Sequence, residues 1–244
     1  MEYHKIISLV PSLTELIIDF GLTDNLIGRT RFCIHPADVV DEIAIIGGTK
    51  NPNIEKIKTL EPDFILANKE ENRKEDIEEL EKDFHVHLTE IDTIDDALIA
   101  IIEIGTQLGA KEKAEDLVQQ IQNTLTQKED YKPLRTAYFI WKEPWMVAGS
   151  NTYIHEIMKE WDLENIFSNQ SRYPEIDLSV LKDESPDLII LSSEPYPFKE
   201  KHIAEVQKFC PNSQIVLLDG EWFSWYGSRM VHSFNALNEW RKGV

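Results

Sequence analysis

The stretch that decides the fold is Leu60-Glu61-Pro62-Asp63-Phe64-Ile65-Leu66-Ala67-Asn68-Lys69-Glu70. It recurs 124 residues later as Glu184-Ser185-Pro186-Asp187-Leu188-Ile189-Ile190-Leu191-Ser192-Ser193-Glu194. Each copy predicts the end of a helix, a Pro-Asp turn, a buried strand and a glutamate at the carboxyl end of that strand. The repeat therefore predicts two α/β lobes of similar construction.

Strand patterns alternate with helix patterns around this repeat. The first half predicts strands over 5–10, 25–28, 43–46 and 64–67. A Ser12-x-x-Glu15 capping box is expected to open a helix directly after the first strand. The alternation restarts in the second half with a strand over 135–140. This order is typical of a parallel sheet covered by helices, so the expected fold class is α/β.

The middle of the chain predicts a long helix. Its apolar residues form one stripe over 111–130, and twenty helical residues span about 30 Å. We therefore expect an N-terminal α/β lobe over 1–110, a linking helix over 111–130 and a C-terminal α/β lobe over 131–244. A ligand cleft is expected between the two lobes, because facing lobes create a concave site.

Composition excludes several function classes. The 244 residues carry 25 Lys and Arg against 44 Asp and Glu, a formal charge of −19 that opposes binding to nucleic acid or anionic lipid. The first ten residues lack a secretory apolar core, which leaves a cytoplasmic protein and a chain that starts after cleavage as open alternatives. Cys33 and Cys210 are expected to be buried free thiols.

Ligands of open parallel sheets bind outside the carboxyl ends of the strands. The segments that follow the predicted strands are therefore candidate ligand contacts: Pro11 and Ser12, 29–35, 47–51, 68–71, 141–149, 192–196 and 221–229. Of these, 219–229 is the most informative, because it holds four aromatic residues in five positions, Trp222, Phe223, Trp225 and Tyr226.

Aromatic side chains offer flat apolar contact to a large planar ligand, and Arg229 could pair with a ligand anion. The alternative is that Trp222 and Phe223 fill the edge of the lobe's core. The turn that holds Trp141, Trp145 and Met146 is a second aromatic candidate with the same two interpretations.

Catalysis finds little support. The sequence has no glycine-rich phosphate-binding loop and no nucleophile elbow. His85 and His87 have the spacing of two metal ligands on a strand, but no third ligand is evident, so exposed strand histidines are the favoured interpretation. His35 is a better candidate for a ligand contact than His85 or His87. We expect no catalytic residue and no metal site.

The pattern as a whole resembles the substrate-binding proteins of ABC importers for cobalamin and iron-siderophores, above all the cobalamin-binding members. The resemblance covers nearly the whole chain. It is carried by Ile7–Glu15, Leu60–Leu66, Pro144–Gly149, Asn151–Met158, Pro186–Leu191, Glu221–Phe223 and Ser228–Arg229. It implies two parallel-sheet lobes bridged by one rigid helix, with the ligand held between aromatic walls.

Site roles follow from the resemblance by position. It implies that Phe32, Trp145, Met146 and Trp222 are the aromatic and apolar walls. It also implies one acidic residue on each lobe that pairs with permease arginines, Glu70 and Glu194, with Glu71 as an alternative to Glu70. Cobalamin-binding members carry a Trp at the position of Asn68, which predicts a more polar site here.

The expected function is the substrate-binding component of an ABC importer, which captures a corrinoid or an iron chelate (siderophore or haem). The expected ligand contacts are Ser12, Phe32, His35, Lys50, Asn68, Lys69, Trp141, Trp145, Met146, Trp222, Trp225, Tyr226 and Arg229. For a ferric chelate, Lys50, Lys69 and Arg229 would be the anion-binding groups.

The expected partners are an ABC permease with its ATPase and a small metal-chelate ligand, with no nucleic acid, no membrane insertion and no cofactor. We expect a monomer, and the family implies a periplasmic or cell-envelope location. Two alternatives stay open: a cytoplasmic enzyme or chaperone that acts on a corrinoid or metal chelate, and a two-lobe module that binds another protein.

Overall fold

The computed structural model describes residues 3–244, and the chain divides into two compact units. The first unit holds the chain up to Ile91 together with Asp95–Asn123 and Tyr226–Val231. The second holds Asp92–Ile94, Thr124–Trp225 and His232–Val244. The expected boundaries at residues 110 and 130 remain a prediction. Among the described helices, none combines the length and the apolarity needed to cross a bilayer.

The first unit is built on a parallel sheet, as predicted. Its strands are β1 (Ile6–Ser8), β2 (Leu26–Arg29), β5 (Phe64–Asn68) and β6 (Val86–Thr89), in the order β2-β1-β5-β6. All three pairings are parallel. The four carboxyl ends therefore lie along one edge of the sheet.

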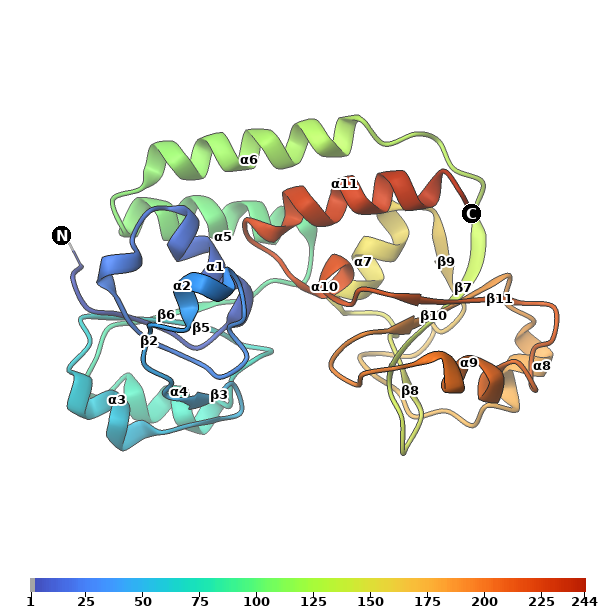
Figure 1. The fold of residues 1–244 in the computed structure, drawn as a ribbon, viewed down its shortest axis with the longest axis horizontal. Helices are drawn as coiled ribbons and strands as arrows, with labels where there is room; N and C mark the ends of the chain where they lie inside the picture. The colour runs from blue at the N-terminus through green and yellow to red at the C-terminus, as the bar shows by residue number, and fades with distance from the viewer. Residues whose placement is uncertain (1–2) are drawn as a thin grey trace. The chain divides into compact units, whose positions relative to one another are not determined.

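Helices cover both faces of this sheet. In Figure 1, α3 (Ile54–Leu60) and α4 (Lys74–Leu80) lie on one side, and α1 (Pro11–Asp19) and α5 (Ile94–Gln107) lie on the other. The α3 and α4 face is filled by eight buried residues, Ile7, Leu9, Ile46, Ile57, Ile65, Ala67, Ile77 and Leu80. A short helix α2 (Ala37–Val40) lies in the segment that follows β2.

The helix α6 (Lys111–Thr126) packs closely on α5. A Cβ added to Gly105 would lie 2.4 Å from the Cβ of Ala114, so glycine permits this approach. The helix ends at Thr126, four residues before its expected end, and the division between the two units falls between Asn123 and Thr124.

Two local predictions were wrong. Ser12 is not a cap: Val10 is the N-cap residue of α1, Pro11 opens the helix, and no side chain caps it. The predicted strand over 43–46 is reduced to an isolated bridge between Arg29 and Ile45. Regular pairing resumes after it, in the two-residue antiparallel strands β3 (Gly47–Gly48) and β4 (Asn51–Pro52).

The second unit has its own sheet. Its strands are β7 (Leu134–Trp141), β8 (Met146–Val147), β9 (Leu163–Asn165), β10 (Leu188–Ser192) and β11 (Gln214–Leu218). The order is β11-β10-β7-β8, and β9 also pairs with β7. Only β8 is antiparallel, so β7, β10 and β11 end at the same edge.

Five helices accompany this sheet, α7 (Tyr153–Glu160), α8 (Val180–Glu184), α9 (Glu200–Val206), α10 (Glu221–Ser224) and α11 (Arg229–Arg241), although the first three residues of α11 belong to the first unit. One face buries Phe139, Ile189 and Leu191 against Leu181 of α8 and Val206 of α9. Aromatic rings of this unit also pack in pairs. The ring centroids of Tyr138 and Phe223 lie 4.9 Å apart, and those of Trp161 and Phe234 lie 4.8 Å apart.

The structure confirms the repeat in detail. The strands β5 and β10 keep the offset of 124 residues at both ends. The helix before each strand ends in a left-handed residue, Glu61 with φ 49° and Ser185 with φ 46°. The aspartate of each Pro-Asp turn accepts a backbone N–H at the start of the central strand. Asp63 Oδ1 accepts from Lys5 at 2.9 Å, and Asp187 Oδ2 accepts from Arg135 at 3.0 Å.

Candidate functional site

At the carboxyl edge of the first sheet, a buried ion pair joins α1 to the start of α11. Arg229 donates from Nε to Glu15 Oε2 at 2.9 Å and from Nη2 to Oε1 at 2.5 Å. The two side chains are only 14% and 13% exposed. Such a two-point contact uses the planar fork of the guanidinium. Ion pairing of Arg229 with a ligand anion remains a prediction.

Burial dominates the electrostatics of this pair. It raises the pKa of Glu15 above its usual value of 4.5, although the hydrogen bond and charge of Arg229 act in the opposite direction. Asp19 raises the same pKa and His35 lowers it, so His35 is near enough to interact with this carboxylate. Ser12 of the same helix is buried, and its carbonyl oxygen lies 3.4 Å from a Cβ added at Gly227.

In the loop after β2, one buried residue lies between two exposed apolar residues. Cys33 is buried, and its Sγ lies 3.0 Å from Thr14 Oγ1 and 3.2 Å from Thr30 Oγ1. Burial raises the pKa of the Cys33 thiol, so the thiol form is favoured. Phe32 and Ile34 are about half exposed. Phe32 therefore offers an aromatic ring to solvent at this edge, and its role as a wall of the ligand site remains a prediction.

Asn68 holds the turn that follows β5. It is 1% exposed, its Oδ1 accepts from the backbone N–H of Glu70 at 2.8 Å, and its Nδ2 donates to Thr89 Oγ1 at 3.1 Å. The amide is thus used inside the unit, a structural role that local sequence did not reveal. A ligand contact by Asn68 remains a prediction.

The two lysines of this region also contact the protein. Lys69 is paired with Glu90 at 2.5 Å, and Lys50 donates to the carbonyl oxygen of Glu70 at 2.5 Å. Both side chains are exposed residues at the edge of the sheet. Exposed pairs of this kind contribute little stability, and both ammonium groups stay accessible to an anion.

In the second unit, aromatic rings gather after β7 and β10. The ring of Trp141 meets Tyr196 edge-on at 5.6 Å, and Trp145 stacks on Phe198 at 5.9 Å. Trp141 is 39% exposed, while Trp145 and Tyr196 are half-buried. Lys142 lies over the Trp145 ring and pairs with Glu205 at 2.5 Å. Tyr196 lies in the candidate segment 192–196, whereas Phe198 lies just beyond that segment and was not predicted.

In the segment over 219–229, three of the four aromatic side chains are buried and one is accessible. Phe223 is fully buried against Tyr138, and Trp225 and Tyr226 are at most 7% exposed. Trp222 is half-buried and is the most accessible of the four. The alternative of an aromatic plug is therefore correct for Phe223, and Trp222 keeps a surface that a ligand can contact.

The three glutamates expected to dock on a permease differ in environment. Glu70 and Glu71 are half-buried, and their backbone N–H groups bind Asn68. Glu194 Oε1 accepts from Ser224 Oγ at 2.8 Å and from Trp225 Nε1 at 2.9 Å. Burial raises the pKa of Glu194, with Glu221 and Asp219 adding to the effect and Ser224 and Trp225 opposing it. Permease docking by these residues remains a prediction.

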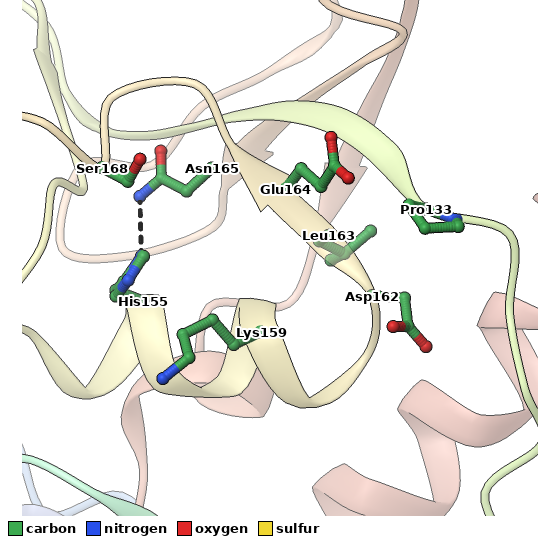
Figure 2. A pocket seen from close by; sticks show the side chains of 8 residues that line it. All are labelled: Pro133, His155, Lys159, Asp162, Leu163, Glu164, Asn165 and Ser168. Carbon is green, nitrogen blue, oxygen red and sulfur yellow. Dashed lines mark hydrogen bonds between the residues drawn. The ribbon is translucent and has the colours of Figure 1, made fainter.

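A hollow of about 330 Å³ lies away from these edges, between α7 and β9 (Figure 2). It is lined by Pro133, His155, Lys159, Asp162, Leu163, Glu164, Asn165 and Ser168. Asn165 Nδ2 lies 3.2 Å from His155 Nδ1, and burial lowers the pKa of His155. None of the predicted ligand contacts lines this hollow.

Metal-ligating side chains do not cluster over residues 3–244, where no group of three or more His, Cys, Asp or Glu could hold an ion. Gln107 Nε2 donates to His87 Nδ1 at 2.9 Å, and the His87 ring stacks on Phe64 at 6.1 Å. His85 stacks on Tyr3 at 5.7 Å. Both histidines therefore pack against aromatic rings of the first unit.

Known proteins resemble this chain over almost its whole length. A family model described as periplasmic binding protein matches residues 6–214. The vitamin B12-binding protein of Pectobacterium atrosepticum is 26% identical over 243 residues, with 93% of this chain and 85% of that protein covered. An ABC transporter substrate-binding lipoprotein of Bacillus subtilis, YvrC, is 26% identical, with 78% of this chain and 63% of that protein covered.

Solved structures share the fold at lower identity. The periplasmic vitamin B12 binding protein BtuF of Vibrio cholerae superposes with a TM-score of 0.82 at 22% identity, and 98% of this chain and 97% of that chain are covered. A periplasmic haem-binding protein of Pseudomonas aeruginosa superposes with a TM-score of 0.84 at 17% identity, and 98% and 92% are covered. The family match spans well over half of the chain, so this chain belongs to the periplasmic binding protein family.

Proposed function

We propose that this protein is the substrate-binding component of an ABC importer and that its ligand is a corrinoid. The observation that carries the proposal is the set of accessible tryptophans, Trp141, Trp145 and Trp222, at the carboxyl edge of the second sheet. Flat apolar rings with polar edges suit a macrocycle that has an apolar face and a polar rim.

The relatives support the same ligand class. The vitamin B12-binding protein of Pectobacterium atrosepticum covers this chain almost completely, and similar proteins of Vibrio cholerae and Photorhabdus laumondii are 24% and 25% identical. Because a haem-binding protein has the same fold, an iron chelate is the alternative ligand. The exposed lysines Lys50 and Lys69 would favour that alternative, because ferric chelates are often anionic.

Within the first unit, Phe32 and His35 are the proposed ligand contacts, and both follow β2 at the carboxyl edge of its sheet. Arg229 would act there through Glu15, by fixing α1 and the start of α11 together. The proposed partners are a permease and its ATPase, and the proposed location is the periplasm or cell envelope, as in the family. The protein is proposed to act without catalysis.

A ligand panel tests this proposal. The purified protein is titrated with cyanocobalamin, haemin and a ferric hydroxamate siderophore, and tryptophan fluorescence quenching is followed. We expect cyanocobalamin to bind at micromolar concentration or below and the two iron chelates to bind at least roughly ten-fold more weakly. The bound ligand is then recovered and weighed by mass spectrometry, and an unchanged mass is expected.

Other outcomes would contradict specific parts of the proposal. Tighter binding of an iron chelate would replace the corrinoid as the ligand class and leave the transport role. A chemically altered ligand would support the enzyme alternative. Absence of binding across the whole panel would favour a module that recognises another protein.

A further inference from the structure

The side chain of Glu194 is half-buried in the second unit, and its carboxylate accepts hydrogen bonds from the protein. Glu194 follows β10 directly, and its side chain turns toward α10 rather than away from the protein. Both Ser224 Oγ and Trp225 Nε1 donate to the same oxygen, Oε1, at 2.8 and 2.9 Å. Since both donors lie at the end of α10, one carboxylate holds two consecutive residues of the aromatic segment.

Hydrogen bonds of two serine side chains also hold the backbone on both sides of this contact. Ser192 Oγ donates to the carbonyl oxygen of Glu194 at 2.5 Å and lies 3.1 Å from the hydroxyl of Tyr138, which is 1% exposed. The neighbouring Ser193 Oγ accepts from the backbone N–H of Gly220 at 2.9 Å. The turn after β10 is thus tied to the central strand β7 and to the residue that precedes α10.

Gly220 shows how closely the two segments approach. A Cβ at this position would lie 2.4 Å from Ser192 Oγ and 2.5 Å from Glu194 Cγ, although its backbone angle of φ −65° suits any residue. The absence of a side chain at Gly220 is therefore required by the contact with Glu194 and not by the local backbone.

We propose that Glu194 is a positioning residue that holds α10, and with α10 the accessible side chain of Trp222, in the conformation that binds the ligand. This inference rests on the proposed function for its ligand, but the contacts that hold α10 exist without one. It differs from permease docking in one property: docking arginines require a negative charge, whereas Ser224 and Trp225 require only an acceptor oxygen.

The charge and the acceptor can be separated by substitution. Glu194→Gln keeps an oxygen that accepts from both donors and removes the charge, while Glu194→Ala removes the acceptor as well. Gly220→Ala disturbs the same contact without altering Glu194. A chain with Glu200→Gln is the matched control, because Glu200 is exposed in the first turn of α9.

The test combines hydrogen exchange of the peptide over 219–226 with the dissociation constant for cyanocobalamin. For Glu194→Ala and Gly220→Ala we expect exchange in this peptide to rise roughly ten-fold or more, with distant peptides unchanged, since local opening is no longer opposed. Affinity should fall roughly ten-fold, because the free protein must now order the segment. Glu194→Gln and Glu200→Gln should match the wild type in both measurements.

Two results would overturn the inference. Unchanged exchange over 219–226 in Glu194→Ala would show that the carboxylate does not hold α10. Equal losses in Glu194→Gln and Glu194→Ala would show that the charge matters and the acceptor does not. If the wild type binds no member of the ligand panel, the proposed function fails, while the exchange measurement still decides whether Glu194 holds α10.

Discussion

At the scale of single residues, Trp222 is the member of the aromatic segment that is best placed to contact a ligand. Its neighbour Phe223 is fully buried, and Trp222 itself keeps accessible surface. We predict that Trp222→Ala weakens cyanocobalamin binding by about 1–3 kcal/mol, the scale of one lost aromatic contact. Titration calorimetry measures this change. Trp240→Ala is the control, because Trp240 is also half-buried but follows no strand. Unchanged affinity in Trp222→Ala would remove this residue from the site.

The Glu15 and Arg229 pair gives a prediction about stability. Arg229→Met leaves a carboxylate buried without its counter-ion, so we expect the free energy of unfolding to fall by about 3–5 kcal/mol at pH 7. Urea unfolding measures it. The double variant Glu15→Gln with Arg229→Met should recover part of the loss, because no charge is then left buried.

The same pair predicts a pH dependence. The pKa of Glu15 is already raised by burial in the folded wild type, and loss of Arg229 removes the group that opposes this. A folded state with the higher pKa binds the proton more tightly, so it gains stability as the pH falls toward the unfolded value of 4.5. The deficit of Arg229→Met relative to wild type should therefore be smaller at pH 5 than at pH 7.5. An equal deficit at both values would show that packing, not charge, is lost.

At the scale of elements, α5 and α6 approach one another at Gly105. Alanine would favour the helix by up to about 1 kcal/mol. Its Cβ would lie 2.4 Å from the Cβ of Ala114, and overpacking of this kind costs about 1–3 kcal/mol. We predict that Gly105→Ala lowers the free energy of unfolding by about 1–2 kcal/mol, measured by urea unfolding.

A double-mutant cycle provides the control for this helix contact. Ala114→Gly costs helix propensity in the wild type but also opens room opposite residue 105. It should therefore cost less, or become favourable, in the Gly105→Ala chain. Additive effects of the two substitutions would contradict a direct steric contact between α5 and α6.

Elements also show what could be predicted from sequence. The strands β5 and β10 were predicted correctly because their signals are local: a helix end, a Pro-Asp turn and an apolar run. The capping box at Ser12 and Glu15 was a wrong prediction because the helix begins earlier, at Pro11, which places Ser12 inside it. The partner of Glu15 is Arg229, which is 214 residues away and invisible to a local pattern. The roles of Asn68 and Glu194 were not predicted because Thr89, Ser224 and Trp225, which hold them, lie 21 to 31 residues away along the chain.

At the scale of the whole molecule, two units of related construction each present a carboxyl edge with accessible aromatic or basic side chains. The fold follows from the repeat and is shared with solved structures, and the family follows from the model that matches residues 6–214. The ligand depends on side chains such as Trp141 and Trp222, whose exposure no sequence pattern specifies. The ligand must therefore be identified by a binding measurement.

The most direct measurement is a calorimetric titration of the purified protein with cyanocobalamin. We expect one-to-one binding with a micromolar or smaller dissociation constant, and a negative heat-capacity change from the burial of apolar rings. The absence of binding heat at two temperatures, with a competition experiment that also detects no complex, would contradict the claim that this protein captures a corrinoid.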